Sequence, residues 1–107
     1  MKRDEVALAA RVGASMFEAD RATREFMQME LVSCEPGRAV LRMTVRDCML
    51  NGHEICHGGM IFTLADSTFA YACNSRNHAT VASGCSIEFL QPAHRGEAAC
   101  APPGHRW

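Results

Sequence analysis

The sequence predicts an α+β domain in which an antiparallel sheet curls around one long central helix. Residues 58–74 are apolar around the whole circumference of a helix, which is typical of a helix buried on all sides. Residues 27–34 and 38–45 alternate between apolar and polar side chains, as strands do. A chain of 107 residues has room for one modest core. The helix therefore needs either a sheet that curls around it or a partner chain.

The first element is a helix over residues 4–19, and a hairpin follows it. One face of this helix carries apolar or small residues, with charged residues opposite: Val6, Ala9, Ala10, Gly13 and Phe17. The tripeptide Glu35-Pro36-Gly37 is a strong turn signal. Because it separates the two alternating runs, we expect them to pair as a β-hairpin. A loop over residues 46–56 then leads into the central helix.

The last predicted strand spans residues 79–90 and ends at Gln91-Pro92. The chain then reaches Gly96-Glu97 and continues as AACAPPGHRW, in which Pro102-Pro103 excludes a central strand. Three strands are too few to wrap the helix, so we expect the last strands of the sheet to be missing. Since no repeat or linker is visible, residues 1–107 are expected to form a single, incomplete domain.

The composition argues against several classes of partner. The net charge is −1 and the pI is near 6.5, so there is no basic field to attract nucleic acid or an anionic membrane. The N-terminus has no continuous apolar segment of a signal peptide, and no run is long enough for a membrane span. We therefore expect a cytoplasmic protein. The cysteines lack CxxC pairs and are expected to be reduced and mostly buried: Cys34, Cys48, Cys56, Cys73, Cys85 and Cys100.

Asp66 is the one carboxylate within the apolar helix, and an unpaired buried carboxylate is costly. The helix opens with Gly58 and Gly59, whose lack of side chains lets a ligand approach the backbone closely. Unpaired N–H groups and the positive dipole end of the helix lie there, a suitable place for a carbonyl oxygen that becomes an oxyanion. Asp66 is a candidate nucleophile or general base, and His57 is a candidate to fix the loop or to donate to a substrate.

The spacing of these residues predicts a site shared between two subunits. Asp66 lies eight residues beyond Gly58, which is about 12 Å along a helix axis. Groups that act on one carbonyl must each lie within roughly 3 Å of a reacting atom. Two antiparallel helices from two subunits would bring Gly58 of one chain to Asp66 of the other, and a two-fold axis would create two such sites. The alternative is purely structural: Asp66 is hydrogen-bonded to Thr63 or Ser67, and the glycines form only a tight turn.

A competing motif lies just before the helix. Residues 53–57, HEICH, match the HExxH pattern of zinc metalloproteases. That chemistry needs both histidines one turn apart on a helix, together with a third ligand. Asn51-Gly52 before the motif and Gly58-Gly59 after it both disfavour a helix there. A zinc site is therefore not expected.

Several strings of the sequence resemble one known family. They are NGH at 51–53, HGGMIF at 57–62, LADS at 64–67, FAYACNS at 69–75, ASGCSIEFL at 82–90 and Pro92-Ala93. These strings resemble the hotdog-fold acyl-CoA thioesterases of the phenylacetic-acid-degradation (PaaI) type, over a region from about residue 4 to Glu97. The resemblance implies a curled antiparallel sheet around one long helix and a homodimer or homotetramer.

The resemblance also implies a reaction, the hydrolysis of an acyl-CoA thioester, with aryl-acetyl or hydroxyphenylacetyl groups as the acyl class. It gives each site residue a role: Asp66 as nucleophile or general base, the Gly58 N–H as donor to the thioester carbonyl, Asn51 orienting water or substrate, His57 supporting the loop, and Gly59, Phe62 and Thr68 binding substrate. Coenzyme A would be the carrier and leaving group, with no other cofactor and no metal.

The sequence departs from the family at its C-terminal end. The family continues with two more strands after Gly96-Glu97, whereas residues 98–107 have no family character. A frameshift or a truncated gene is our hypothesis for this departure. Translation of the downstream DNA in the other frames tests it, because the absence of any alternating strand sequence there would contradict it. The alternative function is a non-catalytic or inactive truncated module that binds acyl-CoA.

Overall fold

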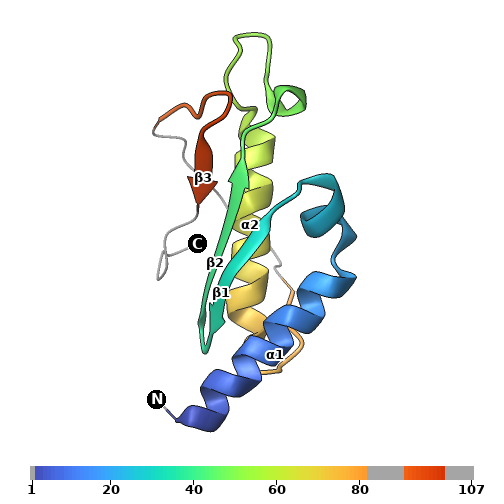
Figure 1. Ribbon diagram of the computed structural model, residues 1–107, viewed down its shortest axis with the longest axis vertical. Helices are drawn as coiled ribbons and strands as arrows, with labels where there is room; N and C mark the ends of the chain where they lie inside the picture. Colours follow the sequence, from blue (N-terminus) through green and yellow to red (C-terminus); the bar gives the residue numbers. More distant parts are fainter. Residues whose placement is uncertain (1, 82–90, 101–107) are drawn as a thin grey trace.

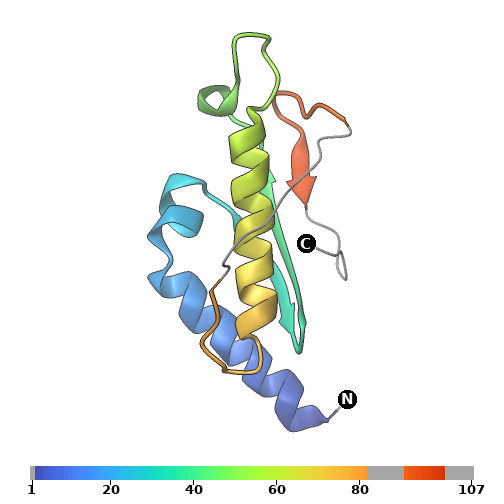
Figure 2. The same ribbon diagram turned by 180° about the vertical axis from the view of Figure 1, so that it is seen from behind.

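A computed structural model describes residues 2–81 and 91–100 of the chain (Figure 1). The elements in chain order are helix α1 (Arg3–Ala19), a π-helical turn η1 (Ala22–Phe26), strands β1 (Glu30–Glu35) and β2 (Arg38–Thr44), a 3₁₀ turn η2 (Asp47–Met49), helix α2 (Gly58–Asn74) and strand β3 (Ala98–Cys100). Helix α2 lies along one face of the sheet, with η1 on one flank and β3 on the other (Figures 1 and 2). The predicted bounds of both helices are confirmed to within one residue.

Strands β1 and β2 form the predicted antiparallel hairpin, with Glu35 opposite Arg38. The turn between them has Gly37 at a φ of +74°, a conformation that favours glycine. Strand β1 begins at Glu30, three residues later than predicted. The cause is the backbone of Met27 and Met29, whose N–H groups donate to carbonyls of η1 and so extend that turn.

The third strand of the described sheet is one that the sequence did not predict. Residues 82–90 of the predicted strand 79–90 lie outside the described residues, and residues 79–81 are not in a strand. The structure instead contains β3, which pairs antiparallel with β2 in a sheet of order β1-β2-β3. The backbone of Val45 secures the approach to β3, because it exchanges hydrogen bonds of 2.9 Å with Gly96 and Glu97. Part of the segment expected to add no strand therefore extends the sheet.

The core lies between the sheet, α1 and one side of α2. Helix α1 turns Ala9 and Gly13 into it, whereas Val6 and Ala10 are exposed, contrary to the predicted face. A Cβ atom on Gly13 would lie 2.6 Å from Cys34 Cβ, so only glycine lets α1 approach β1 this closely. The largest side chains that are fully buried are Tyr71, Leu41, Met43, Met49 and Val45.

Helix α2 is not buried on all sides within one chain. Its buried residues face the sheet and the N-terminal segment: Leu64, Ala65, Ser67, Thr68 and Tyr71. The remaining face carries Asp66 and Gly59, which are exposed, among half-buried apolar residues. Of the two ways to bury α2, the described part of one chain does not supply the first, a sheet that covers the whole helix. A partner chain, the second way, stays a prediction.

Two further predictions concern the setting of the protein. No helix of the described ranges is both long enough and apolar enough to cross a membrane. Cys34, Cys48, Cys56 and Cys73 are thiols and not disulfides, with Cys34 and Cys56 buried. Burial raises the pKa of the Cys34, Cys56 and Cys73 thiols, so their protonated forms are favoured.

Candidate active site at the start of helix α2

Asn51 closes the loop that leads into α2. Its side-chain oxygen accepts hydrogen bonds from the backbone N–H groups of His53, at 2.8 Å, and Ile55, at 3.4 Å. Its backbone N–H donates to the Ile55 carbonyl at 2.8 Å. Two backbone donors fix which end of the amide is the oxygen. The Asn51 amide nitrogen makes no hydrogen bond within the described ranges, so its two N–H donors are available to a ligand.

His57 is the N-cap of α2, and it accepts hydrogen bonds from most of the backbone N–H groups in the first turn of the helix. Its Nδ1 accepts from the Gly59 N–H at 3.0 Å, and its carbonyl accepts from Met60 at 2.9 Å and Ile61 at 3.4 Å. An Nδ1 atom that accepts this bond is the acceptor nitrogen of the ring, which leaves Nε2 as the donor nitrogen. His57 therefore holds the turn, and the Gly59 N–H is occupied.

The Gly58 N–H is the exception among these donors. It has no hydrogen-bond partner in residues 2–81 or 91–100, although it lies at the positive dipole end of a helix of 17 residues. An unpaired donor in that position stabilises negative charge on a nearby oxygen. Gly58 is thus the one residue of this turn that presents a free backbone donor.

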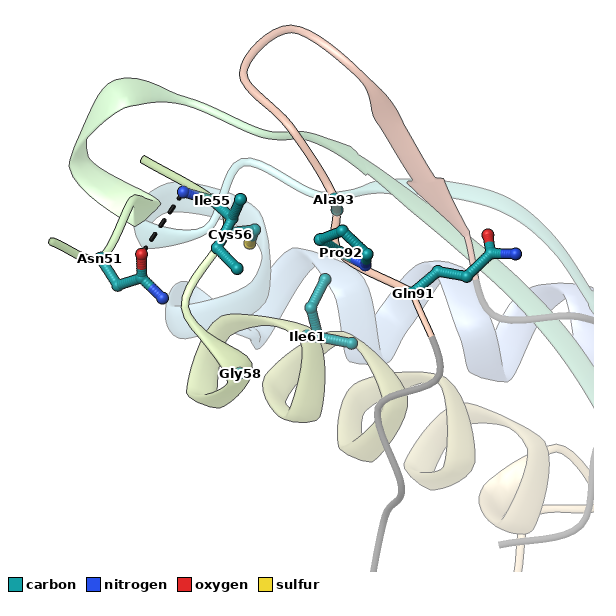
Figure 3. Close-up of a pocket in the computed structure, with 8 residues that line it drawn as sticks. All are labelled: Asn51, Ile55, Cys56, Gly58, Ile61, Gln91, Pro92 and Ala93. Atoms are coloured by element: carbon teal, nitrogen blue, oxygen red, sulfur yellow. Dashed lines mark hydrogen bonds between the residues drawn. The ribbon is translucent and has the colours of Figure 1, made fainter. Parts of the chain in front are cut away.

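A pocket of about 390 Å³ lies in front of this donor (Figure 3). The loop side chains and the segment after residue 90 form two walls, and the first turn of α2 forms the floor. The backbone N–H of Cys56 donates to the Ala93 carbonyl at 2.7 Å, and Ile55 bridges to His94, so the two walls are joined. The lining is mostly apolar: Asn51, Ile55, Cys56, Gly58, Ile61, Gln91, Pro92 and Ala93.

The sequence predicted two of these lining residues, Asn51 and Gly58. Ile61 could have been found, because residues three apart share one face of a helix and Ile61 follows Gly58 by three. Pro92 and Ala93 belong to the family strings but carried no assigned role. Nothing in the local pattern indicates that they pack on the loop.

Asp66 is exposed and lies outside this pocket. It makes no hydrogen bond or ion pair within the part of the chain that the structure describes. The alternative of a structural pairing is wrong, because Thr63 Oγ1 donates to the Gly59 carbonyl and Ser67 Oγ pairs with Thr23 Oγ1. One chain therefore does not bring Asp66 and Gly58 together.

The residues predicted to bind substrate are distributed over different faces. Gly59 is exposed beside His57, and a Cβ atom there would lie 3.3 Å from His57 Nδ1. Phe62 is half-buried on the same face of α2 as Asp66. Thr68 is 2% exposed, and its hydroxyl donates to the Leu64 carbonyl, so it lies apart from both Asp66 and the pocket.

The HExxH segment does not have the geometry of a zinc site. Residues 53–57 are not helical, as predicted, and Glu54 has a φ of +62°. Within the described ranges, no three His, Cys, Asp or Glu side chains are grouped as a metal site requires.

Comparisons with known proteins agree on one family. A sequence model described as the thioesterase superfamily matches residues 53–101. The acyl-coenzyme A thioesterase PaaI of Escherichia coli is 49% identical over 83 residues, which cover 78% of this chain and 59% of that protein. The chain thus spans about three fifths of the length of this curated relative.

Solved structures resemble the fold as well. The E. coli PaaI protein, from the phenylacetic acid degradation operon, superposes with a TM-score of 0.85 at 44% identity, covering 89% of this chain and 68% of that one. A Streptococcus mutans protein solved with acetyl CoA bound has a TM-score of 0.65 at 30% identity, covering 67% of this chain and 58% of that one.

Proposed function

Since the chain belongs to the thioesterase superfamily, with the hotdog fold of its PaaI branch, we propose that it hydrolyses acyl-CoA thioesters to a free acid and coenzyme A. One observation carries the proposal. The Gly58 N–H is an unpaired donor at the start of α2, and Gly58 and Asn51 both line an apolar pocket. A thioester carbonyl needs a donor of this kind as its oxygen gains negative charge.

The chemistry requires a carboxylate from a second copy of the chain. Asp66 is about 12 Å along α2 from Gly58, so an antiparallel partner helix would supply it. The half-buried side chains around Asp66 support such a pairing, because they leave apolar area for a partner to cover: Phe62, Phe69, Ala70 and Cys73. We therefore infer a homodimer with two sites, or a homotetramer built from such dimers.

Two routes use the same groups. As a general base, Asp66 takes a proton from water while that water attacks the carbonyl carbon, after which the C–S bond breaks and coenzyme A leaves as the thiolate, which then takes up the proton. As a nucleophile, Asp66 attacks the carbonyl carbon itself, expels the thiolate and forms a mixed anhydride that water hydrolyses. In both routes Gly58 stabilises the oxyanion, Asn51 orients the reacting group and His57 holds the turn.

The acyl class that we propose is aryl-acetyl, including hydroxyphenylacetyl. A mostly apolar pocket of about 390 Å³ has room for a single aromatic ring beside the Gly58 donor. The E. coli relative comes from the phenylacetic acid degradation operon, and the S. mutans relative was solved with acetyl CoA. Coenzyme A is part of the substrate, and the proposal requires no further cofactor and no metal. A cytoplasmic location completes the proposal, since the thiols described above suit a reducing compartment.

The alternative is an acyl-CoA-binding module without hydrolysis. The observation in its favour is that a single chain keeps Gly58 and Asp66 on separate surfaces. A chain that stays monomeric would offer the pocket and the oxyanion donor but no carboxylate.

The test is the release of coenzyme A thiol from phenylacetyl-CoA, together with the molar mass from size exclusion with light scattering. We expect a dimeric or tetrameric wild type and a loss of about 10²–10⁴-fold in kcat for Asp66→Asn, the usual worth of a positioned acid–base group. The matched charge control is Asp4→Asn, which neutralises an exposed carboxylate in the first turn of α1. Unchanged hydrolysis by well-folded Asp66→Asn would overturn the assigned role, and binding without turnover by the wild type would support the module.

A further inference from the structure

A buried pair of hydroxyls joins the N-terminal segment to α2 beside Asp66. Thr23 Oγ1 and Ser67 Oγ are 2.9 Å apart, and the two residues are only 2% and 9% exposed. Thr23 lies in η1, which runs along one flank of α2 in both views of the fold (Figures 1 and 2). A buried hydroxyl that loses its hydrogen-bond partner costs free energy. The pair therefore favours the one rotation of α2 about its axis that keeps the two hydroxyls in contact.

A second polar contact fixes the same flank one helical turn further along. Tyr71 is fully buried, and its hydroxyl donates to Asp20 Oδ2 at 3.1 Å, while Asp20 Oδ1 accepts from the Thr23 N–H at 3.1 Å. Asp20 thus connects the two contacts, and Ser67 and Tyr71 present them from the same face of α2. Together, these four residues form what we call the flank network: Asp20, Thr23, Ser67 and Tyr71.

The π-helical form of η1 places Thr23 in this network. The Met27 N–H donates to the Ala22 carbonyl at 2.8 Å, a bond across five residues, and the Met29 N–H donates to the Thr23 carbonyl at 2.9 Å. The wider turn leaves the Thr23 side chain directed at α2. Short π-helical turns occur frequently at functional sites.

Asp66 depends on this network because its side chain makes no hydrogen bond or ion pair of its own within the described ranges. It precedes Ser67 in the chain, and its side chain projects about 100° around the helix from that of Ser67. The rotation of α2 about its axis therefore sets the face from which the Asp66 side chain projects. We propose that Thr23 and Ser67 are positioning residues, whose hydroxyl pair orients α2 so that Asp66 is presented to the thioester carbonyl or to the water that attacks it. This inference rests on the proposed thioesterase function.

Thr23→Val, Ser67→Ala and the double variant test the proposal by steady-state hydrolysis of phenylacetyl-CoA. We expect each single variant to lose about five- to tenfold in kcat, as the loss of one buried hydrogen bond allows, with KM changed less than about twofold. The double variant should be no worse than the singles, because each of them already removes the pair.

Ser75→Ala is the matched control. Ser75 is 1% exposed, and its hydroxyl ties the end of α2 to the hairpin turn by accepting from the Gly37 N–H at 2.7 Å. This variant also removes a buried hydroxyl that anchors α2, but far from Asp66. We expect it to lower Tm as much as Ser67→Ala does while leaving kcat unchanged.

A measurement that does not depend on turnover separates this proposal from the proposed function. The ¹³C resonance of the Asp66 carboxyl, followed over pH, should differ from the wild type in Thr23→Val and Ser67→Ala but not in Ser75→Ala. If the Asp66 resonance shifts in these two variants but the wild-type protein hydrolyses no acyl-CoA, the positioning role stands and the thioesterase function fails. If the Asp66 resonance is unmoved in both variants, or moves equally in Ser75→Ala, the positioning role is overturned whatever the activity.

Discussion

The single tyrosine of the chain gives a direct optical test of the buried contact between α2 and the N-terminal segment. Tyr71 is fully buried, and its hydroxyl donates to Asp20 at 3.1 Å. Burial first, and the neighbouring Asp20 carboxylate second, raise the pKa of the Tyr71 phenol well above its ordinary value near 10. We therefore predict that Tyr71 stays protonated in the folded protein at a pH where an exposed tyrosine would ionise.

The raised pKa also fixes the sign of a stability change. Below about pH 10 the phenol is protonated in both the folded and the unfolded chain, so its contribution to stability is fully present there. Above about pH 10 only the unfolded chain releases the proton, so the free energy of unfolding falls by up to about 1.4 kcal/mol per pH unit. At neutral pH, Tyr71→Phe should cost about 1–3 kcal/mol, because it removes a buried hydrogen bond to a carboxylate.

Absorbance at 295 nm, which reports the phenolate, measures this titration, and circular dichroism reports the fold in parallel. We expect no phenolate signal until the protein unfolds in alkali. In urea, where the chain is unfolded, the titration of Tyr71 should have its midpoint at about pH 10, the ordinary pKa of tyrosine. Tyr71→Phe should abolish the signal, which assigns it. A midpoint at that ordinary value while the circular dichroism remains native would refute the reasoning.

Two further predictions concern close contacts of the helices. Gly13→Ala should destabilise the fold by about 1–3 kcal/mol in urea unfolding, since the added Cβ would meet Cys34 Cβ at 2.6 Å. The control is Ala14→Gly, which measures helix propensity alone because Ala14 is exposed on the same helix. A Gly13→Ala variant that is more stable than the wild type would contradict the close contact. His57→Ala should cost about 0.5–2 kcal/mol by thermal unfolding, because the Gly59 N–H loses its cap. His57→Asn, which restores a capping oxygen, should recover most of that loss, and equal stability of all three proteins would exclude the cap.

The sequence predicted the elements whose signals are local. The apolar stretch that opens with Gly58-Gly59 predicted α2 with the bounds that the structure has, and Pro36-Gly37 predicted the hairpin turn. Strand β3 was missed because three residues carry no readable alternation. Their pairing with β2 depends instead on the backbone contacts of Val45.

The candidate site shows the same division. The sequence identified Asn51, Gly58 and His57 in the turn before α2, where glycines and capping residues leave a recognisable pattern. It placed Asp66 in a buried setting, because the composition of α2 does not reveal whether its covering comes from the same chain or from another. The second wall of the pocket, at Pro92 and Ala93, is a tertiary contact that no periodicity records.

The contact between Cys56 and Ala93 has a consequence for the order of folding. The hairpin and the turns of each helix pair residues that are close in sequence. This contact, the one between Val45 and Glu97, and the contacts of α2 with η1 and Asp20 all close long loops of chain. Loop closure costs conformational entropy before the contacts form, so such pairings tend to come late. A chain emerging from the ribosome would thus assemble its helices and hairpin first. The pocket, one wall of which is the segment after residue 90, would be among the last parts to take shape, because that wall is synthesised late.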